Sequence, residues 1–159
     1  DFEDLQDPYG IQFWPTFKGR DGCRTPMVWN SGNMNAGFSE VAPWLPVPPE
    51  HIHSAVSEQE QASGSLLNHY RDVLAFRAQH PAFAKGKIRF VHVSDEALVF
   101  ERAHQGTTIL VAYNMSDKEI SISLPNSGFE PLEAKFATGE MQGADLTLPA
   151  YGSFFATAI

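Results

Sequence analysis

The sequence predicts a mixed fold, in which a loop-rich first third and two helices are followed by an all-β antiparallel sandwich or barrel. Residues 1 to about 53 hold seven of the eleven prolines and all three tryptophans, with little periodicity, which is typical of a long connection. A helical pattern follows, and from Lys87 onward the apolar period changes from about 3.6 residues to about two. This change predicts a boundary near Phe83 to Gly86, which divides the chain into residues 1–85 and 86–159.

The loop-rich segment carries several aromatic side chains that would be exposed to water unless they pack on a scaffold. These are Phe13, Trp14, Phe17, Trp29, Phe38 and Trp44. Structureless loops longer than ~12 to 15 residues are uncommon within compact domains. We therefore expect the segment to pack on a scaffold that is mostly missing from this sequence.

Two helices are predicted between this segment and the strands. The first, roughly residues 54–61, is short and polar, and Gly64 ends it. The second begins with Ser63 or Ser65 as its N-cap and stops before Pro81. Its apolar residues recur at three- and four-residue spacing and form one stripe, made of Leu66, Leu67, Tyr70, Val73, Leu74 and Ala78. The stripe predicts a helix that lies on the outside of a larger body.

Seven short strands are predicted in the last part of the chain. They are IRFVHV (88–93), ALVFER (97–102), TTILVAYN (107–114), EISISL (119–124), LEAKFA (132–137), ADLTL (144–148) and SFFATA (153–158). Turn-forming pieces separate them, such as residues 104–106 and 125–128. Close spacing without an intervening helix favours an antiparallel sandwich or barrel.

The composition argues against several classes of partner. Nineteen acidic residues against eleven basic ones give a net charge of -8, and no basic stripe is present that could neutralise phosphates. Neither nucleic acid nor an anionic membrane is therefore expected, and no apolar run approaches the ~20 residues of a membrane helix. Cys23 is the only cysteine, so no intrachain disulfide can form, and we expect a cytoplasmic location. The start at Asp1, without Met, leads us to expect a chain cut from something longer, with processing of a precursor as the alternative.

The histidines do not form a recognisable set of metal ligands. His51 and His53 form a pair in a proline-rich loop, but no third ligand lies nearby in the sequence. His69 and His80 share a helical face, yet the rise of ~1.5 Å per residue separates them by about 16 Å. We therefore predict no metal site and no cofactor.

Nucleophilic and carboxylate chemistry have little support from the residue pattern. Cys23 would need a base held beside it, and no such pattern is visible, so it is interpreted as a small filler residue. Glu3 and Asp7 are four residues apart, and carboxylate pairs do the work in glycosidases. Acidic groups near an exposed end are usually solvated, however, so no catalytic residue is predicted in this chain.

Arg24 stands at the centre of a segment, residues 19–44, that is rich in glycine, proline and tryptophan. Such a composition is suited to holding a loop still. A guanidinium offers five donors in a flat fork that suits neighbouring sugar hydroxyls or a carboxylate. Two readings follow from the residues: Arg24 binds a sugar, or it forms an ion pair with Asp21 or Asp7 that staples the loop.

Several motifs resemble those of one family. They are RTPMVW (24–29), AGF (36–38), PW (43–44), SLLNHYR (65–71) and LVAYN (110–114). Together they resemble the oligo-1,6-glucosidase, α-glucosidase and sucrose-isomerase branch of glycoside hydrolase family 13, the α-amylase family. The resemblance covers essentially the whole chain.

The resemblance implies a retaining α-glucosidase built on a (β/α)8 barrel. Residues 1 to about 53 would be the long loop after the eighth strand, residues 54 to about 82 the last helices, and residues 86–159 the sandwich called domain C. The fold is thus the end of a (β/α)8 barrel followed by an all-β antiparallel sandwich. The family's catalytic carboxylates lie in earlier segments, so the chain alone is predicted to be inactive, with the missing N-terminal part of the enzyme as its partner.

The resemblance also assigns one residue to substrate binding. Arg24 is similar to the family's arginine that binds hydroxyls of the non-reducing glucose, so an α-glucoside oligosaccharide is the expected ligand. Val28 departs from the motif, where glutamine is common, which leaves linkage preference open. The alternatives are a sucrose-isomerase-type glucosyl transferase and a non-catalytic carbohydrate-binding or structural β-sandwich module.

Overall fold

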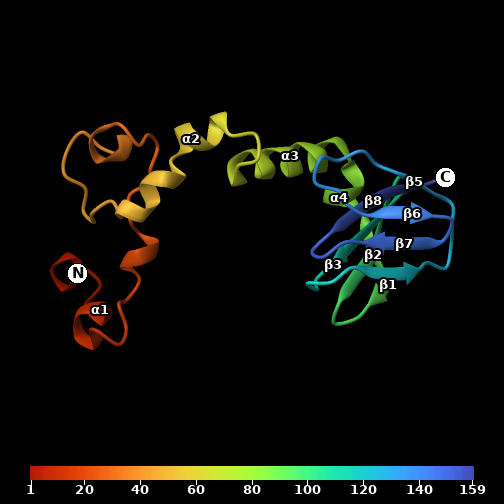
Figure 1. Ribbon diagram of the computed structural model, residues 1–159, viewed down its shortest axis with the longest axis horizontal. Coiled ribbons are helices and arrows are strands. Elements are labelled where there is room, and N and C mark those ends of the chain that lie inside the picture. The colour runs from red at the N-terminus through yellow and green to blue at the C-terminus, as the bar shows by residue number, and fades with distance from the viewer. The chain divides into compact units, whose positions relative to one another are not determined.

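The computed structural model describes residues 1–159, which form two compact units, Asp1–His69 and Tyr70–Ile159 (Figure 1). None of the helices is both long enough and apolar enough to cross a membrane.

The first unit contains short helical turns and no strand, which confirms the prediction of a loop-rich segment. Its elements are η1 (Phe2–Asp4), α1 (Pro8–Phe13), η2 (Asp21–Cys23), η3 (Met34–Gly37), η4 (Pro49–Ser54) and α2 (Val56–Gln61). The sequence predicted only the last of these. Pro8 and Pro49 stand at the first positions of α1 and η4, where the missing N–H of proline costs nothing.

The core of the first unit is small. Val28, Ala36 and Ala55 are buried together, with Val47 and Ile52 partly covered against them. The six aromatic side chains singled out in the sequence stay between 36% and 62% exposed. These 159 residues therefore do not supply the scaffold that the aromatic side chains were predicted to need.

Ser65 precedes helix α3 (Leu66–Gln79) and caps its N-terminus, since its Oγ accepts the backbone N–H of Asn68 at 3.2 Å. One of the two predicted N-caps is thus confirmed. The helix ends before Pro81, where the short helix α4 (Pro81–Lys85), not predicted, begins.

The predicted apolar stripe of α3 is mostly uncovered by this chain. Leu66, Tyr70 and Leu74 are 59% to 66% exposed. The buried residue of the helix is Phe76, which lies outside the stripe and was missed by the periodicity. Its ring packs edge-on against Phe136 and Phe155 of the β-rich part.

The second unit is an antiparallel sandwich of two sheets, as predicted (Figure 1). Its strands are β1 (Lys87–Val93), β2 (Ala97–His104), β3 (Thr107–Asn114), β4 (Ile120–Ser123), β5 (Phe129–Pro131), β6 (Glu140–Gln142), β7 (Asp145–Leu148) and β8 (Ser153–Ala158). One sheet has the order β1-β2-β3-β8-β5 and the other β4-β7-β6. The predicted division of the chain at residue 85/86 stays a prediction.

Two apolar clusters cover the two faces of the larger sheet. Leu110 and Ala112 face the smaller sheet, where Leu146 and Leu148 are also fully buried. On the opposite face, Ile109 and its neighbours meet α3, α4 and the segment 132–137. Strand β3 is therefore buried on both sides, which explains its continuous apolar run.

The predicted strand at residues 132–137 is wrong. Leu132 donates its N–H to the carbonyl of Phe155 at 2.9 Å, but the backbone then turns, with Ala137 N donating to Ala134 O at 3.0 Å. The alternating apolar side chains still pack on the outer cluster of the large sheet. Two short strands, β5 and β6, were missed on either side of this segment.

The predicted turn between β2 and β3 is confirmed as a two-residue hairpin. Gln105 and Gly106 have φ angles of 47° and 84°. Two consecutive residues with positive φ fit the type I′ turn, whose twist matches that of the flanking strands.

Candidate substrate-binding site

Arg24 directly follows the short helix η2 in the first unit. Its backbone N–H donates to the carbonyl of Asp21 at 2.9 Å, while its side chain is exposed to solvent. On its C-terminal side, Pro26 and Val28 are buried. The guanidinium thus projects from a backbone that is anchored on both sides.

The loop after Arg24 is held by backbone hydrogen bonds. Trp29 and Asn30 both donate to the carbonyl of Ala36, at 2.9 and 3.0 Å. Val28 accepts a hydrogen bond from Val56 N at 3.1 Å, which ties the loop to the start of α2. These hydrogen bonds close the loop between residues 29 and 36 and support the prediction that the segment is held in place.

The same loop contains backbone strain. Asn35 and Ala36 have φ angles of 49° and 55°, and Ala36 is only 4% exposed. Residues with side chains adopt this left-handed region at a cost and keep it only where their surroundings enforce it. Such strain is common at ligand-binding sites.

The two carboxylates considered as partners of Arg24 bind other groups. Asp7 Oδ2 accepts hydrogen bonds from both the backbone N and the Nε of Arg20, each at 2.9 Å. Asp21 Oδ2 accepts the backbone N–H groups of Gln6 and Asp7, at 2.6 and 2.8 Å. The structure therefore does not form the ion pair that would make Arg24 a staple, because Arg20 has that role.

Asp7 has a strongly lowered pKa. Hydrogen bonds from the Arg20 side chain, and then from its backbone N–H, hold the pKa of this carboxyl at about 2, below its ordinary value of 3.8. The side chain also caps α1, since its Oδ1 accepts Tyr9 N at 3.1 Å. Asp7 is therefore structural, because both of its carboxylate oxygens are bound within the first unit.

We expect the charge on Asp7 to stabilise the first unit only above a threshold pH. Because its folded pKa is lowered, the stabilisation is complete above pH 3.8 and is lost as the pH falls toward about 2. All three tryptophans lie in the first unit, so an acid titration followed by tryptophan fluorescence reports on it. Asp7→Asn should shrink the change between these two pH values, and superimposable curves for the two proteins would contradict the assignment.

The other candidate nucleophile, Cys23, lies on the surface of the first unit. Its side chain is exposed, and its Sγ donates to the carbonyl of Arg20 at 3.0 Å. Cys23 therefore does not pack inside a core as a small filler residue.

The histidines are distributed over several elements of the chain. His51 and His53 are exposed on η4, and no three His, Cys, Asp or Glu side chains of residues 1–159 lie together as a possible metal site. His80 donates from Nδ1 to the carbonyl of Phe76 at 2.7 Å, and its ring contacts Phe83. His80 thus has a structural role at the junction of α3 and α4.

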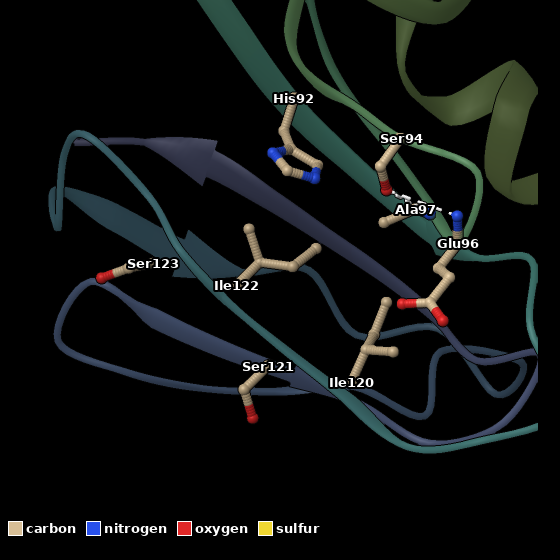
Figure 2. A pocket seen from close by; sticks show the side chains of 8 residues that line it. All are labelled: His92, Ser94, Glu96, Ala97, Ile120, Ser121, Ile122 and Ser123. Carbon is tan, nitrogen blue, oxygen red and sulfur yellow. Dashed lines mark hydrogen bonds between the residues drawn. The ribbon is translucent and has the colours of Figure 1, made fainter.

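A pocket of about 250 Å³ opens between the edge strands β1 and β4 (Figure 2). Figure 2 shows Ile120 and Ile122 below His92, while Ser121 points away from the opening. Ser123 is also occupied elsewhere, since its Oγ donates to Asp145 at 2.7 Å. The lining contains no tryptophan, tyrosine or phenylalanine, so this pocket has no platform of that kind on which a sugar ring could stack.

Comparison with known proteins identifies the class and then the family. The order of a loop-rich segment, last helices and a β-sandwich is that of the end of a barrel enzyme with its trailing domain. The family model described as the alpha amylase catalytic domain matches residues 2–86, and that of the maltogenic amylase C-terminal domain matches residues 88–155. The chain therefore belongs to the α-amylase family.

Curated relatives carry α-glucosidase names. The chain is 51% identical over 156 residues to a probable alpha-glucosidase of Rhizobium meliloti (strain 1021), covering 98% of this chain and 28% of that protein. It is 33% identical over 127 residues to the probable oligo-1,6-glucosidase 2 of Bacillus subtilis (strain 168), covering 79% of this chain and 22% of the relative. The chain thus spans less than a third of these relatives.

Solved structures agree in fold. The alpha-glucosyl transfer enzyme XgtA matches with a TM-score of 0.87 and 42% identity, over 100% of this chain and 30% of XgtA. A mutant of the trehalulose synthase MutB matches with a TM-score of 0.71 and 27% identity, over 87% of this chain and 26% of MutB.

Proposed function

We propose that this chain is the C-terminal part of a retaining α-glucosidase that hydrolyses α-glucosidic bonds of short oligosaccharides, and that Arg24 binds the substrate. One observation carries the proposal. Arg24 presents an exposed guanidinium, not paired with either nearby aspartate, from an anchored loop in the segment matched by the catalytic-domain family model.

The chemistry assigned to Arg24 is binding and orientation. An arginine side chain stays charged at any working pH, so it cannot act as a general acid. Its five N–H donors suit two adjacent sugar hydroxyls. Bond cleavage would require two carboxylates ~5 to 5.5 Å apart, and we assign these to the part of the enzyme beyond these residues.

The exposed apolar surfaces of each unit support this proposal. In the first unit, Trp29 and Trp44 are 51% and 62% exposed, although large aromatic rings are normally well covered. In the second unit, Phe90 of β1 and Leu74 of α3 are about as exposed. We propose that the rest of the catalytic barrel covers these side chains, since large exposed apolar side chains are common at interaction surfaces.

The stereochemistry of the product tests the proposed activity. Incubating the full-length protein with maltose or isomaltose and following the anomeric protons by NMR should show α-glucose appearing first. Retention follows from a double displacement, in which two inversions occur at the same carbon. Initial release of β-glucose, or no release from either sugar, would refute the proposal.

A second candidate is transfer of a glucosyl group to an acceptor other than water. Its support is the 42% identity to XgtA, which is described as an alpha-glucosyl transfer enzyme. The two activities share the glycosyl-enzyme step and differ in what attacks it. Adding an alcohol or sugar acceptor would distinguish them, because a transferase forms the glucoside of the acceptor in preference to free glucose.

The remaining alternative, a non-catalytic binding or structural module, has less support. A module would not be expected to resemble a catalytic domain over residues 2–86. The sandwich strands also contain no tryptophan with which to build a sugar platform.

A further inference from the structure

We propose that Asp21 is a positioning residue, which fixes the turn carrying Arg24 so that the guanidinium meets the substrate in one orientation. This inference rests on the proposed function of Arg24. Asp21 itself does not touch the substrate and acts through Arg24.

Asp21 is a buried carboxylate with a defined set of bonds. Its side chain is among the few buried charged groups of the chain, with the residue only 6% exposed. Oδ2 accepts two backbone N–H groups, from Gln6 at 2.6 Å and Asp7 at 2.8 Å. A single oxygen thereby ties the turn to a segment about fifteen residues earlier in the chain.

The backbone of Asp21 connects this anchor to Arg24. The Asp21 carbonyl accepts the N–H of Arg24 at 2.9 Å, and the intervening Cys23 N–H donates to Arg20 O at 3.1 Å. Arg24 is the residue that ends this 3-10 turn. Any shift of Asp21 therefore moves the Arg24 backbone, and with it the Cα from which the side chain extends.

A second carboxylate secures the residue before Asp21. Asp7 binds Arg20 through Oδ2, and the two segments approach so closely that Gly19 is required between them. Gly19 has a φ of 72°, and a Cβ there would lie 2.9 Å from Asp7 Cβ. Residues 6–7 therefore pack closely against residues 19–21. Of the two arginines in this segment, Arg20 binds Asp7, while the side chain of Arg24 is paired with neither Asp7 nor Asp21.

The other oxygen of Asp21 makes a sharp experiment possible. Oδ1 is buried and has no hydrogen-bond partner. An asparagine can keep the oxygen that accepts the two N–H groups and place its amide where no bond existed. Asp21→Asn should therefore preserve the position of Arg24, whereas Asp21→Ala removes both bonds.

The test compares Asp21→Ala, Asp21→Asn, Arg24→Ala and the double variant Asp21→Ala/Arg24→Ala in the full-length protein, with maltose as substrate. We expect Asp21→Ala to lower kcat/KM roughly 10- to 100-fold and Asp21→Asn to stay within about threefold of the parent. Because Asp21 acts through Arg24, the double variant should be within about threefold of Arg24→Ala alone. Asn114→Ala, a destabilising change in the sandwich, serves as a control and should leave KM unchanged.

Three results would overturn the inference: parental kinetics for Asp21→Ala, equal losses for the Asn and Ala variants, or losses that multiply in the double variant. The failure of the underlying function looks different. If Arg24→Ala itself keeps the parental kcat/KM, the assignment of Arg24 to substrate binding fails, and this inference fails with it. If Arg24→Ala is impaired and Asp21→Ala is not, only the positioning role is lost.

Discussion

Arg24→Ala is expected to lower kcat/KM of the full-length enzyme for maltose about 100- to 1000-fold, or about 3 to 4 kcal/mol. Hydrogen bonds from a charged donor contribute about 1.5 to 3 kcal/mol each, and the guanidinium can donate two to adjacent hydroxyls. In Arg24→Ala, both sugar hydroxyls would lose the guanidinium as their hydrogen-bond donor. We expect most of the loss to appear in KM, because Arg24 binds the substrate and takes no part in proton transfer.

Two further variants sharpen this prediction. Arg24→Lys keeps the positive charge and loses the flat fork of donors, so it should recover only part of the activity. Arg89→Ala is a matched control, since Arg89 is also an exposed arginine and pairs only with Glu101 on the neighbouring strand. Its kcat/KM should equal that of the parent. Equal kinetics for Arg24→Ala and the parent would contradict the binding role.

Asn114→Ala is expected to destabilise the sandwich by about 3 to 5 kcal/mol. Asn114 ends β3 and is 3% exposed. Its Nδ2 lies 2.6 Å from Lys118 O, 3.3 Å from Leu148 O and 2.8 Å from Pro149 O, while its Oδ1 accepts the backbone N and the Oγ of Ser116. Alanine would leave the carbonyls of Lys118, Leu148 and Pro149 without this donor.

Chemical unfolding followed by far-UV circular dichroism measures this change, because the strands lie in the second unit. Ser116→Ala is the graded control, since it removes one hydroxyl and keeps the Asn114 amide in place, and it should cost about 1 kcal/mol. Tryptophan fluorescence reports on the first unit alone and should change little with either variant. An Asn114→Ala protein with the parental midpoint would contradict the structural role of this side chain.

The sandwich could be predicted from the sequence where local pattern and tertiary packing agree. Strands β2, β3 and β8 are rich in β-branched and aromatic residues, and the turn at Gln105 and Gly106 has the chemistry of a hairpin. The alternation of apolar and polar residues at 132–137 led to a wrong strand prediction. The same alternation arises here in a loop whose apolar side chains pack on the core. Strands β5 and β6 were missed because each has three residues, too few for a periodic signal.

Helix α3 has an exposed apolar stripe and one buried residue outside it. The stripe of α3 predicted a face to be covered, yet this chain leaves Leu66 and Tyr70 exposed. Phe76, near the C-terminal end of α3, is buried because its ring packs against Phe136 and Phe155, which lie far away in the sequence. Periodicity finds a stripe on a helix, but it does not say which partner covers a residue outside it.

At the candidate site, Arg24 could be found from the residue pattern, but its surroundings could not. Composition alone left the choice between a sugar and an ion pair, and only the resemblance favoured the sugar. That Arg20 takes Asp7, and that Asp21 binds the backbone of residues 6 and 7, depends on contacts between segments about fourteen residues apart. No spacing rule links such segments within an irregular loop.

The most direct test of the account is an assay of the purified 159-residue chain beside the full-length protein, with maltose and a chromogenic α-glucoside. We propose that these residues contribute a substrate-binding arginine and no catalytic carboxylate. We therefore expect glucose release by the full-length protein and none above the buffer rate by the chain alone. Release that rises in proportion to the concentration of the isolated chain, and persists after contaminating glucosidases are removed, would contradict it.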